Sequence, residues 1–152
     1  MVLGSDLEET ANHDCGWNAA LDRLGPVNTP ATIVRVPHHG SVTGHSVRMW
    51  SEIVHEKALA ALTPFSRGIT PLPTTQDVAR IKSLASQVFL TAAAKKLPPV
   101  KQNDRLTGSM RRVTRSLHEA EGLPGRVTLR GPLQLTTEGQ ITVELAEPAR
   151  RV

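Results

Sequence analysis

Short apolar runs alternate with segments of helical periodicity over the first 91 residues. Residues 31–36 form a compact β-branched run, and similar apolar runs at 2–3, 58–62 and 88–91 also predict strands. Apolar residues recur at helical spacing in 46–54 and 76–86, and a shorter helix fits 18–24, which Gly25-Pro26 would end. Strands that alternate with helices predict an α/β fold with a mixed or parallel sheet.

The pattern changes after Thr91. Residues 92–108 include three Lys, two Pro and Gly108 and predict a linker, and Ser109 is placed to cap a basic helix that runs to about residue 121. Residues 127–130 and 141–145 alternate with a period of two around a turn at Glu138-Gly139, which predicts a β-hairpin. We therefore divide the chain into an α/β unit (1–91), a linker (92–108) and an appendage of basic helix and hairpin (109–152).

Charge is distributed unevenly along the chain. Residues 1–91 hold 7 Lys and Arg against 8 Asp and Glu, whereas residues 92–152 hold 11 against 6. The basic residues of the predicted helix, Arg111, Arg112 and Arg115, are candidates for contact with nucleic acid, although a solvated helix face is the simpler interpretation.

Cysteine content and hydropathy exclude several classes of protein. The single cysteine, Cys15, rules out a disulfide within the chain and a cysteine-based zinc finger. No apolar run approaches the roughly 20 residues that a membrane span requires, and the N-terminus lacks the pattern of a signal peptide. We expect a cytoplasmic protein without a membrane partner.

Two polar loops each follow a predicted strand directly. The first is Val2-Leu3-Gly4-Ser5-Asp6, with Glu8 behind it, and the second is Val36-Pro37-His38-His39-Gly40-Ser41. A carboxylate and an imidazole at adjacent strand ends can converge on one metal ion, and zinc accepts both types of ligand. Taken singly, each motif has a simpler interpretation: Asp6 as a turn or cap residue, and the two histidines as part of a surface loop.

The sequence resembles metallo-β-lactamase-fold hydrolases, most closely those of bacterial DNA-uptake (competence) channels. The resemblance rests on a strand followed by Gly-x-Asp and, about thirty residues later, a second strand followed by Pro-His-His-Gly-Ser. The resemblance covers residues 1–91 and implies the C-terminal half of an αβ/βα sandwich, with a mixed sheet and flanking helices. It implies that Asp6 bridges two zinc ions, with manganese as an alternative, and that His38 binds one of them. His39 is the second choice of ligand or a supporting residue, and Glu8, Gly40 and Ser41 shape or support the loop.

The departures from that family pattern are as informative as the match. The family's His-x-His-x-Asp-His motif should precede Asp6, but this sequence has no such motif before Asp6. The isolated histidine that the family carries between the two motifs is also absent. The sequence therefore offers fewer than the three protein ligands of a catalytic zinc. Half of a sandwich would also expose a sheet face. We therefore expect a C-terminal fragment or subunit of a phosphodiesterase-like or nuclease-like hydrolase, incomplete alone and either truncated or completed by a polypeptide that carries the missing motif. The alternative is a degenerate, non-catalytic module that binds a partner protein and holds no metal.

Overall fold

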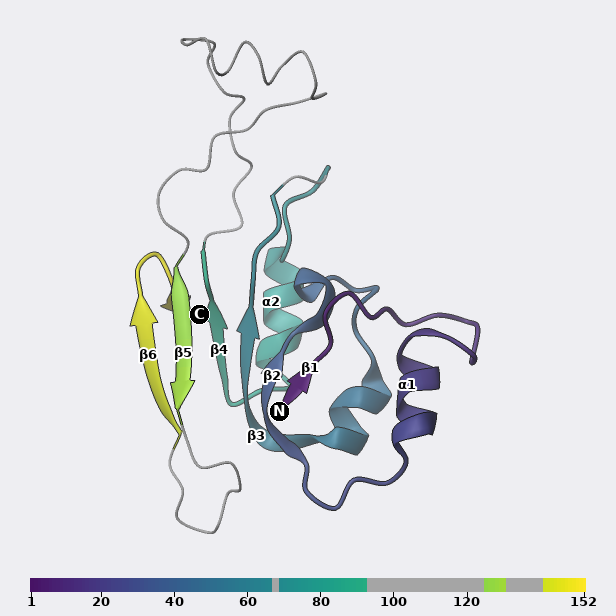
Figure 1. The fold of residues 1–152 in the computed structure, drawn as a ribbon. Helices are drawn as coiled ribbons and strands as arrows, with labels where there is room; N and C mark the ends of the chain where they lie inside the picture. The colour runs from purple at the N-terminus through teal and green to yellow at the C-terminus, as the bar shows by residue number, and fades with distance from the viewer. Residues whose placement is uncertain (67–68, 93–124, 131–140) are drawn as a thin grey trace, which may run out of the picture.

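A five-stranded mixed sheet organises the protein (Figure 1). The computed structural model describes residues 1–66, 69–92, 125–130 and 141–152. The strands lie in the order β1 (Val2–Leu3), β2 (Ala31–Arg35), β3 (Val54–Leu62), β4 (Gln87–Leu90) and β7 (Arg150–Arg151). The first four strands are parallel and β7 runs antiparallel to β4. The predicted α/β class with a mixed sheet is confirmed.

Within the described residues, four helical segments connect these strands. They are α1 (Gly16–Leu24), the 3₁₀ turn η1 (Pro37–Gly40), the π-helical turn η2 (Met49–Ile53) and α2 (Thr75–Lys82). None of the helices in the described ranges combines the length and the apolar character that a bilayer crossing requires.

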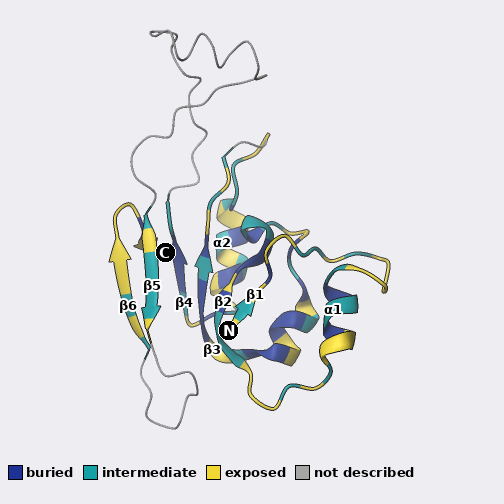
Figure 2. Ribbon diagram, in the orientation of Figure 1, coloured by how far each residue is buried: buried dark blue, intermediate teal, exposed yellow. Residues whose placement is uncertain are grey.

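All of the core-forming helical segments pack on one face of the sheet. Because successive strand residues point to opposite faces, Val34, Ala58, Ala60, Leu62 and Val88 share a face and are almost fully buried. They form one apolar cluster with side chains from the helical segments, namely Trp17, Leu21, Met49, Trp50, Ile53 and Ile81. In Figure 2 the central strands and parts of the helices are dark blue, which marks their residues as buried.

The opposite face of the sheet is not uniformly exposed. Arg35 is exposed there, as expected for an uncovered face, but Leu59 and Phe89 retain only 7% and 2% of their accessible surface. The parallel register pairs Leu59 with Gln87 and Ala61 with Phe89, and β7 then pairs with β4 beyond them. The buried part of this face is therefore the part nearest the β7 edge.

The helix predicted for residues 46–54 is shorter than its periodicity indicates. The Met49 N–H donates to the Ser46 Oγ at 3.3 Å, as the predicted cap at Ser46 requires, but the π-helical turn itself starts at Met49 with Arg48 before it. The helix ends at Ile53, however, and Val54 starts β3 by pairing with Ala31 of β2. A β-branched valine fits both a helical apolar stripe and a buried strand, and sheet pairing decides between them.

The boundaries of α1 and α2 also differ from the prediction. α1 starts at Gly16, two residues before the predicted start, because Trp17 is buried in the core. α2 starts in a capping box between Thr74 and Asp77 but ends at Lys82 rather than residue 86. Ser86 leaves the helix because its hydroxyl donates to the carbonyl oxygens of Lys57 and Ala58, at 2.9 and 3.1 Å.

The predicted C-terminal hairpin is confirmed. Its strands, β5 (Arg126–Arg130) and β6 (Thr142–Ala146), pair antiparallel along their whole length as a separate two-stranded sheet. β7 follows the hairpin and returns the chain to the main sheet. The predicted turn at Glu138-Gly139, the basic helix with Arg111, Arg112 and Arg115, and the linker beyond Ala92 lie outside the described residues.

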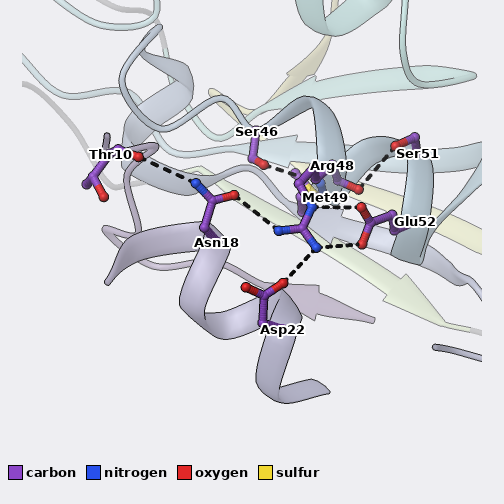
Figure 3. A network of polar contacts seen from close by, with 8 residues as sticks. All are labelled: Thr10, Asn18, Asp22, Ser46, Arg48, Met49, Ser51 and Glu52. Atoms are coloured by element: carbon purple, nitrogen blue, oxygen red, sulfur yellow. Dashed lines mark hydrogen bonds and ion pairs between the residues drawn. The ribbon is translucent and has the colours of Figure 1, made fainter. Parts of the chain in front are cut away.

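Arg48 ties α1 to the start of the η2 segment (Figure 3). Its guanidinium donates to Asp22 at 2.9 Å, to Asn18 at 3.2 Å and to both carboxylate oxygens of Glu52 at 2.8 and 3.3 Å. The hydrogen bonds to Glu52 and then Asp22 raise the pKa of Arg48 above its ordinary value. Asp22, Arg48 and Glu52 also border a surface pocket of about 510 Å³.

Candidate functional site

The sheet topology brings the two polar loops together. β1 and β2 are parallel neighbours, so the loops that follow them leave from the same edge of the sheet. The His38 N–H donates to the Ser5 carbonyl oxygen at 2.8 Å and joins the loops directly. The predicted proximity of the Asp6 loop and the His38 loop is therefore present at the level of the backbone.

The closest polar cluster in this region contains Glu8, His38 and Thr43. His38 Nδ1 lies 2.5 Å from Glu8 Oε1 and 3.0 Å from Thr43 Oγ1, and the Thr43 hydroxyl donates to Glu8 Oε1 at 2.8 Å. Ser41 Oγ lies 3.0 Å from Thr43 Oγ1 and accepts the Gly44 N–H at 3.2 Å. The side chains of His38 and Glu8 remain 33% and 43% exposed, so the cluster opens to solvent.

His39 points to a different part of the fold. Its Nδ1 lies 2.7 Å from the Thr63 carbonyl oxygen at the end of β3, and its ring stacks on Phe65 with the centroids 4.9 Å apart. The ring centroids of His38 and His39 are 6.4 Å apart and tilted by 58°. The two histidines thus have separate supports within one loop.

The backbone of this loop is strained. His38 and His39 have φ values of 45° and 55°, and Gly40 follows at 85°. A left-handed conformation costs a non-glycine residue roughly 1–2 kcal/mol, so two in succession require strong support from the surroundings. Part of that support comes from Arg80, which donates to the Gly40 carbonyl oxygen at 2.7 Å.

Gly40 occupies a position that favours glycine for two reasons. Its positive φ favours glycine, and an added Cβ would lie 2.6 Å from the Leu62 Cδ2 in the core. The Gly40 position therefore combines a turn with a close approach between the loop and β3.

Asp6 stands apart from this cluster. Its side chain is exposed and makes no hydrogen bond or ion pair with another residue in the described ranges, whereas the neighbouring Glu8 contacts His38 directly. The carboxylate that the structure places on the histidine is therefore Glu8, which the sequence offered only as a supporting residue.

Thr43 is the residue of the cluster that sequence reasoning missed. Besides its side-chain contacts, its carbonyl oxygen accepts the Glu9 N–H at 2.7 Å, so it holds the Glu8 segment by backbone as well. The signal in the sequence is weak: a hydroxyl residue and a glycine, Thr43-Gly44, in the loop after the His-His-Gly-Ser run.

Trp17 supports the cluster through hydrogen bonds to the backbone of its two segments. The Trp17 side chain is 3% exposed, its indole N–H donates to the Gly44 carbonyl oxygen at 3.1 Å, and its backbone N–H donates to the Glu8 carbonyl oxygen at 3.1 Å. One buried residue of α1 therefore anchors both segments that hold His38.

The surroundings of His45 displace its pKa. Burial is the largest cause that lowers the pKa of His45 below its ordinary value, and the positive charge of Arg80 lowers it further. The negative charge of Glu9 raises the pKa but does not outweigh them. The neutral form of His45 is therefore favoured at neutral pH. His45 also borders a pocket of about 190 Å³ with Trp50 and His55.

The donor chemistry and the donor count lead to different conclusions about a metal. Imidazole and carboxylate are ligand types that zinc accepts, but a catalytic zinc takes three protein ligands. Among the described residues, no group of three or more His, Cys, Asp or Glu side chains is arranged to hold a metal ion. The described residues by themselves therefore do not fit a complete zinc site.

Comparisons of the chain with protein-family models, with curated proteins and with solved structures find no match.

Proposed function

We propose that this chain is the C-terminal part of a metal-dependent hydrolase that acts on phosphodiester bonds, with Asp6 and His38 as its contribution to the metal site. The observation that carries the proposal is the Glu8–His38 pair, 2.5 Å apart, in loops that leave the same edge of a parallel sheet. A carboxylate that fixes a histidine ring is the arrangement that metal-binding histidines use in proteins. The preference for phosphodiesters rests on the resemblance to metallo-β-lactamase-fold hydrolases and on the basic last third of the chain.

The proposal requires further ligands from outside the described residues. The described side chains supply too few donors for catalytic zinc, so no catalytic step through a metal is derived from them. The missing donors would come from a polypeptide segment with the His-x-His-x-Asp-His motif. We therefore expect this chain to bind zinc weakly when it is isolated.

The metal proposal is tested by adding Zn²⁺ to the ¹⁵N-labelled chain and following the histidine side chains by NMR. We expect Zn²⁺ to perturb the His38 ring, and we expect the perturbation to be lost in His38→Asn and reduced in Asp6→Asn. Asparagine is chosen at position 38 because it tolerates the left-handed backbone of His38.

His55→Asn is the matched control, since His55 lies at the start of β3 and accepts the Lys57 N–H. Zinc should perturb His38 in this variant as in the natural chain. An identical response to zinc in the natural chain and in an Asp6→Asn/His38→Asn double variant would contradict the proposal.

A second candidate function is a non-catalytic module that binds a partner protein. The observation that favours it is the edge position of β1, where Met1 is 73% and Leu3 60% exposed. An open strand edge with exposed apolar side chains can pair with a strand of another polypeptide. This candidate predicts that Leu3→Glu disrupts association of the chain with its partner, whereas Asp6→Asn and His38→Asn leave it unchanged.

A further inference from the structure

The hydrogen-bond partners of His38 determine which ring nitrogen carries the proton. An ionised Glu8 carboxylate can only accept a hydrogen bond, and it lies 2.5 Å from His38 Nδ1. The Nδ1 atom must therefore be the donor. Thr43 Oγ1, which gives its own proton to Glu8, is 3.0 Å from the same Nδ1 and shares the proton as a second acceptor.

The directions of the other hydrogen bonds in the cluster can be assigned in the same way. Because the Thr43 proton is committed to Glu8, the contact between Ser41 and Thr43 is made by the Ser41 hydroxyl donating to Thr43 Oγ1. The Gly44 N–H donates in turn to Ser41 Oγ. A directed chain of donors thus runs from the Gly44 backbone through Ser41 and Thr43 to Glu8, with His38 as the other donor to that carboxylate.

The second nitrogen of the His38 ring, Nε2, has no hydrogen-bond partner among the described residues. A third of the His38 side chain is exposed. In a neutral imidazole with its proton on Nδ1, the Nε2 atom carries the lone pair.

We propose that Glu8 and Thr43 are positioning residues that hold neutral His38 in the tautomer with its proton on Nδ1 and so leave the Nε2 lone pair free as an acceptor. The use of that lone pair in hydrolysis rests on the proposed function, but the tautomer itself does not. His39 is an internal comparison, because its Nδ1 faces the Thr63 carbonyl oxygen, an acceptor that no side-chain substitution removes.

The test is a long-range ¹H–¹⁵N correlation spectrum of the histidine rings at pH 8, above the ordinary histidine pKa of about 6.5. The His38 and His39 signals are assigned by their loss in His38→Asn and His39→Asn. We expect both rings to show the pattern of a proton on Nδ1 in the natural chain. A natural chain in which His38 carries its proton on Nε2 would overturn the proposal without any further variant.

The roles of Glu8 and Thr43 are tested separately. We expect Glu8→Ala to shift His38 toward the other tautomer, and a Glu8→Ala/Thr43→Val double variant to complete the shift, while His39 keeps its pattern and reports that the loop is folded. Thr43→Ser retains the hydroxyl and should retain the natural tautomer. Ser51→Ala, which removes a hydroxyl that donates to the Arg48 carbonyl oxygen, is the control and should change nothing at His38.

An unchanged His38 tautomer in the double variant, with the His39 pattern intact, would show that Glu8 and Thr43 do not position the ring. The outcome is independent of zinc binding. A positive tautomer result with no zinc response in the natural chain would remove the proposed hydrolase function and leave this inference standing.

Discussion

At the scale of single residues, His38 and His39 stand out because two successive non-glycine residues have positive φ. Local sequence preference explains it only in part, because histidine adopts positive φ more often than most residues but positive φ is still uncommon for any residue other than glycine. Both rings are instead held by contacts with distant segments, His38 by Glu8 and Thr43 and His39 by the Thr63 carbonyl oxygen. The contacts offset a conformational cost that would otherwise open the loop.

This strain predicts an order of stability at position 39. His39→Asn and His39→Val both remove the ring, but asparagine tolerates positive φ whereas a β-branched valine does not. We expect the free energy of unfolding of the valine variant to be about 1–2 kcal/mol lower than that of the asparagine variant. Urea denaturation with unchanged m-values would measure the difference.

Arg35 provides the matched position for that comparison. It is exposed and lies in β2, regularly paired with Leu3 and Ala61, where valine is favoured over asparagine. The order of the two substitutions should therefore reverse at Arg35. The same order at both positions would indicate a difference in side-chain chemistry rather than backbone strain at His39.

At the scale of elements, α1 acts as a support for the loops that carry the cluster. Its buried Trp17 joins the core and also bonds to the Gly44 and Glu8 backbones. Packing of α1 and the position of Thr43 are thereby linked, since Thr43 precedes Gly44 directly. A change within the helix should reach the candidate site through this contact.

Trp17→Phe tests that link. Phenylalanine fills most of the space but leaves the buried Gly44 carbonyl oxygen without its donor, which we expect to lower the free energy of unfolding by about 1–3 kcal/mol. Amide chemical shifts of Thr43 and His38 should move as well. Trp50→Phe is the control, because Trp50 belongs to the same core, and it should leave those two shifts nearly unchanged.

At the scale of the whole molecule, one buried carboxylate connects fold stability to pH. Burial alone would raise the pKa of Asp77, but hydrogen bonds from the Thr74 side chain and backbone, together with Arg80, outweigh it and lower the pKa below its ordinary value. A carboxylate with a lowered pKa in the folded state stabilises the fold above its unfolded pKa, near 4, and this contribution is lost as the pH falls through the folded pKa.

Asp77→Asn should therefore reduce stability at neutral pH and have less effect in acid. We expect a loss of about 1–2 kcal/mol at pH 7 from the weaker hydrogen bonds that Thr74 donates to the side chain at position 77 and from the missing Arg80 partner. The difference from the natural chain should shrink below about pH 4, where Asp77 becomes protonated. Urea denaturation across pH 3–7 measures it, and a difference that stays constant with pH would show that the charge of Asp77 is not responsible.

Much of the fold follows from local periodicity. The strands β1, β2 and β4, the helix α2 and the hairpin β5–β6 lie where apolar spacing and turn residues predict them, with ends displaced by a few residues. The boundaries moved where a tertiary contact competed with the local pattern, as at Val54 and Ser86. Periodicity contains no information about those contacts.

The sequence by itself determined the α/β class and the position of each polar loop directly after a strand, because each depends on residues close together in the chain. Only the tertiary structure decided that Glu8, rather than Asp6, contacts His38, that Thr43 joins them across 35 residues from Glu8, and that β7 returns to the main sheet. These features depend on which distant segments the sheet brings together, and that choice is made by packing of the whole core.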